Sequence, residues 1–341
     1  MGRRDETHEF SSAYIARMPF LVRFLGTAAS RPTVERGVSA LALIREGETI
    51  LVDCGEGTQR QMMRYGISFS FEDLVFTHTH SDHILGLTGL IRTLQLQGRT
   101  EPLRLWGPPG AARTLRQCIS LGGERTTFPI TITELEPGAS VKRKDYRIDT
   151  FAVDHQSASC IGLAFVEEDR LGRFNPDLAR ALGIPEGPLW GQIHKGQPIT
   201  LDDGRVIEPS VLVGLPRRGR RVVITGDTRP CAGTILAAQD ADLLIHEATF
   251  ADDEAARALE TGHSTAREAA DVARRAGARR LLLTHISARY SREAHELERE
   301  ARSVFAKTQV AKDGFEVELD LTEEISAEIS GEISGDPSSA A

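Results

Sequence analysis

Residues Leu74–His83 read LVFTHTHSDH. The first four are apolar or β-branched, a composition that predicts a buried strand. The last six, His78 to His83, hold three histidines and one aspartate. Residues 84–94 beyond them are apolar with helical spacing, so we expect a helix there. The polar cluster therefore lies where a strand gives way to a helix.

This cluster points to metal binding. His78 and His80 are two residues apart, so an extended backbone projects both to the same side. Asp82 and His83 follow after the chain has turned, and they point elsewhere. That division suits two neighbouring metals better than one, and imidazole with carboxylate favours zinc or another borderline divalent metal. Capping or surface roles would explain one histidine, but three with an aspartate after a strand favour a metal site.

The same pattern recurs along the chain, because five expected strands end in residues that can bind metals or move protons. In layered α/β folds such strand ends share one edge, where active sites form. Chance is a poor explanation for five of them. Besides the strand before His78, the stretches are Thr150–His155, Arg221–Thr228 with Asp227 near its end, Ala241–Thr249 with Glu247 near its end, and Arg280–His285.

These residues can be assembled into a site for two metals about 3.5–4 Å apart. The expected ligands are His78, His80 and His155 for the first metal, Asp82, His83 and His285 for the second, and Asp227 as a bridge. Water between such metals loses a proton near neutral pH, and Asp82 can accept that proton. His263 is a candidate donor to a departing 3′-oxygen, with Glu247 holding its imidazole.

Each assignment outside the cluster has a structural alternative. His155 could cap a strand, and Asp227 could be an ordinary turn aspartate. Glu247 and His263 could form a buried pair that stabilises the core. His246 is expected to be structural, and no role is assigned to His8, His194 and His295.

The bulk composition is that of an ordinary globular protein. The chain has 341 residues, 40% hydrophobic and 26% charged, enough for one large or two modest domains. It has no apolar run long enough for a bilayer and only four scattered cysteines, so we expect a cytoplasmic protein without a membrane partner. With a net charge of −8, any nucleic-acid partner would have to be met by local basic patches.

The chain is expected to divide into one catalytic domain, residues 20–321, and two tails. Residues 1–19 lack periodicity and residues 322–341 are an acidic repeat, so we expect a mobile N-terminal tail and a disordered C-terminal tail. Residues 167–215 interrupt the domain with a short helix at Pro176–Gly183, an irregular Ile184–Pro188 and a turn at Leu201–Val206. Such an insertion is either a tolerated surface loop or a binding element.

Together, the motifs resemble those of the metallo-β-lactamase superfamily and, within it, the ribonuclease Z family. His78–His83 alone would mark only the superfamily. The likeness runs from about Phe20 to Val310, and its most specific parts are HEAT at His246–Thr249, HST at His263–Thr265 and THISARY at Thr284–Tyr290. It also includes FLGT at Phe24–Thr27, DCGEGTQ at Asp53–Gln59 and GDT at Gly226–Thr228.

The resemblance implies an α/β fold, a four-layer αβ/βα sandwich with a protruding flexible arm, and a homodimer with two zinc ions per subunit, manganese being possible instead. It implies an endoribonuclease that removes the 3′ trailer from precursor tRNA, leaving a 3′-hydroxyl on the tRNA and a 5′-phosphate on the trailer. Asp82 is then the proton acceptor, and Glu247 and His263 assist the leaving group. Residues 167–215 become a tRNA-binding arm, whose phosphate contacts are Arg170, Arg173, Arg180 and Lys195, or backbone amides.

One departure concerns the loop after the first strand. The family often has a glycine-rich turn there, whereas this chain has TAASRP at Thr27–Pro32, so the local backbone is expected to differ. Two other functions are considered: hydrolysis of small phosphodiesters or sulfate esters, against which the arm argues, and a catalytically idle RNA-binding protein, against which the complete ligand set argues.

Overall fold

A computed structural model describes residues 20–123, 125–156 and 158–320. The two expected tails, residues 1–19 and 322–341, lie outside these residues. The described chain forms two compact units. The larger comprises residues 20–167 and 220–320, and the smaller, which we call the inserted unit, comprises residues 168–219.

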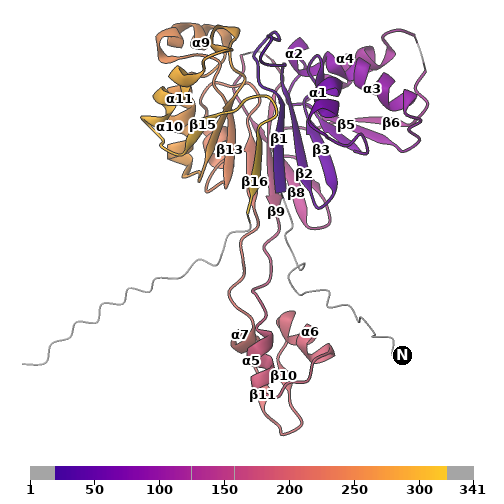
Figure 1. Cartoon of the computed structure of the whole chain (residues 1–341), viewed down its shortest axis with the longest axis vertical. Coiled ribbons are helices and arrows are strands. Elements are labelled where there is room, and N and C mark those ends of the chain that lie inside the picture. Colours follow the sequence, from indigo (N-terminus) through magenta and orange to yellow (C-terminus); the bar gives the residue numbers. More distant parts are fainter. Residues whose placement is uncertain (1–19, 124, 157, 321–341) are drawn as a thin grey trace, which may run out of the picture. The chain divides into compact units, whose positions relative to one another are not determined.

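The larger unit is built on two seven-stranded sheets (Figure 1). The first has the order β16-β1-β2-β3-β4-β5-β6, formed by Glu316–Leu319, Phe20–Gly26, Ala40–Arg45, Glu48–Val52, Asp73–Val75, Leu103–Gly107 and Ile130–Glu134. The second has the order β15-β14-β13-β12-β9-β8-β7, formed by Thr308–Val310, Leu281–Thr284, Leu243–Glu247, Arg221–Ile224, Ile161–Glu167, Tyr146–Ala152 and Ser140–Lys142.

Alternation along the strands separates the two faces of each sheet. Ile50 and Val52 of β3 pack in the core between the sheets, with Leu243 and Ile245 of β13. Leu51 instead faces a core that the sheet shares with α1, α3 and α4, which are Thr58–Arg64, Gly86–Leu96 and Ala111–Ser120. The second sheet shares its outer core with α8, α10 and α11, which are Ala232–Ala237, Ala266–Ala276 and His295–Arg302. The expected helix–sheet–sheet–helix sandwich is confirmed (Figure 1).

Strand direction explains where a site can form. In the first sheet, β1, β3, β4, β5 and β6 run the same way, since β1 and β3 are both antiparallel to β2 and the others pair in parallel. In the second sheet, β8, β12, β13 and β14 share one direction. The loops after these strands therefore lie at one edge of each sheet. The chain leaves this unit at Glu167 and re-enters at Arg220, at the opposite edge of the second sheet.

The helix expected over residues 84–94 starts earlier and is interrupted. It begins as α2, Ser81–Ile84, and continues as α3 after Leu85. The interruption accompanies a close backbone crossing, in which the Gly86 N–H donates to the carbonyl of Cys54 at 2.8 Å. A Cβ on Gly55 would lie 2.3 Å from the Asp82 carbonyl, so glycine is required there. The loop that contains Gly55 therefore passes close to the polar cluster.

The inserted unit has a small core of its own, made of Ala179, Ile184, Ile193, Ile199, Ile207 and Leu212. It contains α5 (Pro176–Ala181), α6 (Pro188–His194), α7 (Pro209–Leu212) and a hairpin of β10 (Ile199–Thr200) and β11 (Val206–Ile207). The expected irregular structure is confirmed for residues 184–187. It is wrong at Pro188, because proline fits the first turn of a helix and begins α6. The expected turn at Leu201–Val206 is the loop of the hairpin, with Val206 already in β11. In the described residues, no helix is long and apolar enough to cross a membrane.

Candidate metal centre

Loops at the shared strand ends bring all the site residues expected from the sequence together. His78 and His80 follow β4, and Asp82 and His83 lie in α2. His155 follows β8, Asp227 follows β12, Glu247 ends β13 and His285 follows β14. His263 lies between α9 (Ala255–Thr261) and α10. Three overlapping groups each have potential ligand atoms within 4.8 Å of one another. They are His78, His80, His155 and Asp227; Asp82, His83 and His285; and Asp227, Glu247, His263 and His285.

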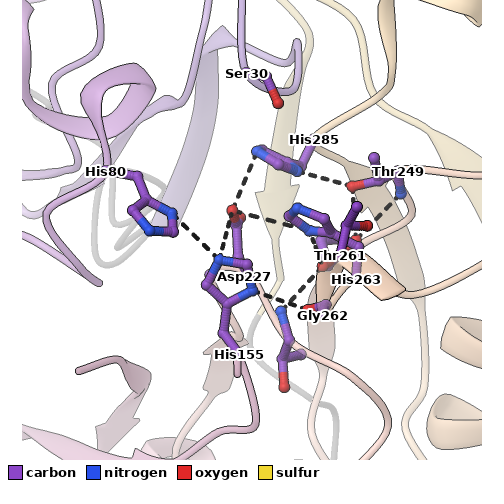
Figure 2. A network of polar contacts seen from close by, with 12 residues as sticks. Ser30, His80, His155, Asp227, Thr249, Thr261, Gly262, His263 and His285 are labelled. Carbon is purple, nitrogen blue, oxygen red and sulfur yellow. Dashed lines mark hydrogen bonds and ion pairs between the residues drawn. The ribbon is translucent and has the colours of Figure 1, made fainter. Parts of the chain in front are cut away.

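Asp227 occupies the centre of this arrangement (Figure 2). Its Oδ2 lies 3.6 Å from Nε2 of His78 and 3.3 Å from Nε2 of His285, while its Oδ1 lies 3.5 Å from Nε2 of His83. One carboxylate thus faces histidines of both expected ligand sets. Burial alone would raise the pKa of Asp227, but the imidazoles of His285 and His83 hold it well below its usual range.

The two sets are compact. In the first, Nε2 of His155 is 3.3 Å from Nδ1 of His80, the one exposed histidine of the centre. In the second, Nε2 of His285 is 3.2 Å from Oδ2 of Asp82. Burial would raise the pKa of Asp82, but the hydrogen bond with His285 and the positive charge of His83 lower it.

Four of the histidines are oriented through Nδ1, which leaves Nε2 directed into the centre. The partners of Nδ1 are Thr77 Oγ1 for His78 at 3.1 Å, Asp53 Oδ2 for His83 at 2.8 Å, the Gly262 carbonyl for His155 at 2.8 Å, and Thr249 Oγ1 for His285 at 2.9 Å. Carboxylate, hydroxyl and carbonyl partners of this kind fix the orientation of metal-binding imidazoles.

The donor atoms fit a divalent cation. Nε2 of His78 and Nε2 of His83 are buried, and neither has a hydrogen-bond partner among the described residues. Leaving buried polar atoms unpaired is costly, and a cation beside the carboxylates of Asp82 and Asp227 would remove that cost. Imidazole nitrogen and carboxylate oxygen are donors of the kind that zinc and similar metals accept.

Beside the metal centre, the buried Glu247 pairs with His263, which is partly buried. Oε1 of Glu247 accepts from His263 Nδ1 at 2.8 Å and from the Thr228 N–H at 3.0 Å, and Oε2 accepts from Thr249 and the Ser264 N–H. Burial would lower the pKa of His263, but the charge of Glu247 raises it to about 9. The raised pKa favours the protonated imidazole, which is the form that a proton donor needs.

A cavity of about 510 Å³ opens next to His263. Three arginines, Arg31, Arg257 and Arg289, line it together with Ser30, Phe250 and Ser287. Among the described residues, the guanidinium groups of Arg31 and Arg257 form no hydrogen bond or ion pair. The cavity thus offers positive charge to an anionic ligand despite the negative charge of the chain.

Two contributors were missed by the sequence analysis. Asp53 follows β3 at the same sheet edge and accepts from Thr77 as well as from His83, with a left-handed φ of 59°. A strand ending in aspartate was the signal used elsewhere, and it was also present here. Ser30, in the loop that departs from the family pattern, donates its N–H to Asp82. That contact is made by the backbone, so residue type gave no signal.

Solved structures define the class of this protein. A metallo-β-lactamase fold protein from Bacillus subtilis superposes with a TM-score of 0.65 at 20% identity, covering 89% of this chain and 100% of its own. Family models agree in part, since residues 191–286 match a β-lactamase superfamily domain and residues 20–178 match the anti-Pycsar protein Apyc1. The fold and the His–Asp cluster are those of a metallo-β-lactamase-fold protein with a divalent metal site.

More similar relatives give the family. The ribonuclease Z of Gemmatimonas aurantiaca is 74% identical over 91% of this chain and 99% of its own length, and that of Myxococcus xanthus is 53% identical over 88% and 98%. The short form of human tRNase Z is 28% identical with a TM-score of 0.63, covering 89% of this chain and 100% of its own. This chain belongs to the ribonuclease Z family.

Proposed function

We propose that this protein is an endoribonuclease that removes the 3′ trailer from precursor tRNA. Family membership over nearly the whole length supports this function. The observation that carries it is the convergence, at one edge, of seven candidate ligands with the hydrogen-bonded pair of Glu247 and His263. Products with a 3′-hydroxyl on the tRNA and a 5′-phosphate on the trailer would follow from a departing 3′-oxygen.

Two zinc ions would complete the centre, with manganese as an alternative. His78, His80 and His155 would hold one, Asp82, His83 and His285 the other, and Asp227 both. When bound, such metals supply Lewis acidity, which favours deprotonation of water and offsets the charge that develops on the phosphate.

Proton transfers are assigned to residues of the chain. Asp82 accepts the proton of the attacking water, since its carboxylate stays ionised even when buried. His263 gives a proton to the departing 3′-oxygen, and Glu247 keeps the imidazole charged and oriented. Glu247 and His263 could instead form a purely structural pair. In that case, substitutions at these residues that preserve the fold should leave the rate of bond cleavage unchanged.

The arginine-lined cavity supports an RNA substrate at the metal centre. Arg31 and Arg257 have no anionic partner among the described side chains and lie beside His263. Guanidinium groups bind phosphate oxygens well. We assign neighbouring phosphates of the cleaved strand to this cavity.

The inserted unit is the proposed site for the body of the tRNA, and a homodimer is the proposed assembly. Of its candidate cations, Arg180 is already paired with Asp177 and Glu186 at 2.8 Å each. Arg173 and Lys195 are exposed, and neither has a side-chain partner among the described residues. His194 contacts the Gly172 carbonyl, so the two free cations lie in one part of the unit. The four unpaired cysteines suit the cytoplasm proposed as its location.

The test is cleavage of a precursor tRNA that carries a 3′ trailer, with the cut mapped, before and after treatment with a chelator. Cleavage at the trailer junction that disappears with chelator and returns with zinc or manganese is expected. Asp82→Asn should lower the rate by roughly 10²–10⁴-fold while tRNA binding persists. If the wild-type protein hydrolyses a chromogenic phosphodiester but leaves precursor tRNA intact, the small-substrate alternative is favoured instead.

A further inference from the structure

The loop from Thr27 to Gly37 delivers a backbone donor to the proton acceptor of the site. The N–H of Ser30 donates to Oδ2 of Asp82 at 2.7 Å. A charge-assisted contact of this length limits how the carboxylate can rotate. Ser30 holds a left-handed φ of 60°, which residues other than glycine adopt only when their surroundings impose it.

A side chain outside the metal centre holds both ends of this loop. Oδ1 of Asp313 accepts from the Thr27 hydroxyl at 2.8 Å, and Oδ2 accepts from the Gly37 N–H at 2.6 Å. One carboxylate therefore ties both ends of the loop. Gln61 donates to the same Oδ2 at 2.7 Å, which anchors the carboxylate to α1.

Arg36, which belongs to the loop, also holds it in place. Its guanidinium is buried and donates to the Thr27 hydroxyl at 2.7 Å, the Ala311 carbonyl at 2.6 Å and the Ser291 carbonyl at 3.2 Å. On the other side, the loop pairs with the backbone next to His285, because the Ala29 N–H donates to Ile286 and the Ile286 N–H donates to Thr27. The loop thus has one fixed path past Asp82 and His285.

We propose that Asp313 and Arg36 are positioning residues for the proton-accepting carboxylate Asp82, acting through the Ser30 N–H. Neither residue belongs to the groups of candidate ligands, and neither lines the cavity beside His263. They hold the loop so that Ser30 keeps one carboxylate oxygen in place, which leaves Asp82 in a single orientation towards the attacking water. Displacements of about 1 Å in a catalytic group can cost roughly 10²-fold in rate, so such a tie has measurable consequences. The inference rests on the proposed role of Asp82.

Asp313→Asn tests the proposal with little change in shape. An amide has one acceptor oxygen, so Thr27, Gly37 and Gln61 cannot all be satisfied. Asp73→Asn is the matched control, because Asp73 is also buried and bonded to Arg104 and Trp106, but lies at the far end of β4 from His78. Both variants should lower the melting temperature.

Only Asp313→Asn should speed hydrogen exchange of the Ser30 amide and lower kcat, by roughly tenfold. KM and bound metal should stay within roughly twofold of wild type, as expected when only the orientation of Asp82 changes. In single-turnover assays, adding Asp313→Asn to Asp82→Asn should cause no further loss, because the tie acts through Asp82.

An unchanged Ser30 exchange rate, an unchanged kcat, or an equal fall of kcat in Asp73→Asn would each overturn the proposal. If Asp313→Asn does not fold, Arg36→Lys replaces it, with the same expected results. The single nitrogen of lysine cannot reproduce the three hydrogen bonds that the Arg36 guanidinium donates. The Ser30 exchange rate and the turnover of a chromogenic phosphodiester test the positioning role even if the wild-type protein leaves precursor tRNA uncut. Failure of the positioning role can therefore be distinguished from failure of the proposed function.

Discussion

Four candidate metal-binding histidines are held through Nδ1, and the partner of Nδ1 influences the orientation of Nε2. Among these four, only His83 is held by a carboxylate, with Asp53 Oδ2 at 2.8 Å from its Nδ1. Asp53→Asn should lower metal affinity by roughly 10–100-fold, because the imidazole loses its orientation and some basicity. Competition with a chromophoric chelator measures this affinity. Glu56→Gln, at an exposed carboxylate of the same loop, should leave it unchanged, and an equal loss in both variants would contradict the role of Asp53.

A second residue-scale prediction concerns acid stability. Burial would raise the pKa of Glu167, but hydrogen bonds from Arg220 and Arg45 lower it to about 2, from an ordinary 4.5. Its contribution is therefore complete above pH 4.5 and is lost as the pH falls towards 2. Glu167→Gln should cost on the order of 2 kcal/mol near neutral pH, less at pH 3.

Denaturant unfolding at several pH values measures this difference. Glu168→Gln, at the exposed neighbouring position, should follow the wild-type curve. A constant difference between Glu167→Gln and wild type across pH 2–5 would show that the carboxylate is not shifted.

Elements could be predicted from the sequence where pattern and packing agree. The strands around Phe24, Leu51, Leu244 and Leu282 were recognisable because buried runs of β-branched and aliphatic residues favour strands. The start of α10 could be narrowed to Ser264 or Thr265, since both residue types cap helices, and in the structure Thr265 is the cap. The division between α2 and α3 was not recognisable, because it accompanies a crossing of the backbone at Gly86 with the backbone at Cys54, which is distant in the sequence.

The site shows the same contrast. The clustering of side chains at the strand ends could be predicted from the expected strand order. The contact of the Ser30 N–H could not, because a backbone group is the same in every residue type, and Asp313 could not, because it acts through a loop. In the inserted unit, the sequence could not tell which arginines and lysines are neutralised by a carboxylate and which are not. That Arg180 is neutralised by Asp177 and Glu186 follows only from the structure.

This distinction gives a prediction for the inserted unit. Arg173→Ala and Lys195→Ala should each weaken precursor tRNA binding and reduce the slope of log affinity against log salt by about one. Arg180→Ala is the matched control and should leave the slope unchanged, because its charge is already compensated. Filter binding at several salt concentrations is the measurement, and equal slopes for all three variants would contradict the assignment.

The whole inserted unit can be removed cleanly, because Arg170 and Arg217 exchange two backbone hydrogen bonds at its base. Replacing residues 171–216 with two glycines should retain hydrolysis of a chromogenic phosphodiester. Activity on precursor tRNA should fall by at least roughly tenfold, since the remote contacts are lost. Unchanged tRNA cleavage would contradict a binding role for this unit.

For the whole molecule, the metal centre joins the two sheets, since His78 and His83 come from one and Asp227 and His285 from the other. Metal binds this folded arrangement, so removal by chelator should lower the melting temperature by several degrees, and zinc should restore it in a concentration-dependent way. Differential scanning calorimetry checks this, with the Asp227→Asn variant expected to respond far less. A melting temperature indifferent to chelator would argue against a metal that bridges the sheets.

The pairing of β1 with β16 has a consequence for synthesis on the ribosome. Among the described residues, β1 is the first strand to be made and β16 is the last, so one edge of β1 stays uncovered until β16 has been made. The candidate ligand atoms are spread from residue 78 to residue 285. At roughly 5–20 residues per second, the stretch between His83 and His285 takes on the order of 10–40 s to translate. A growing chain therefore lacks a complete set of candidate ligands until His285 has been made, and a chain that terminates before β16 leaves one edge of β1 uncovered.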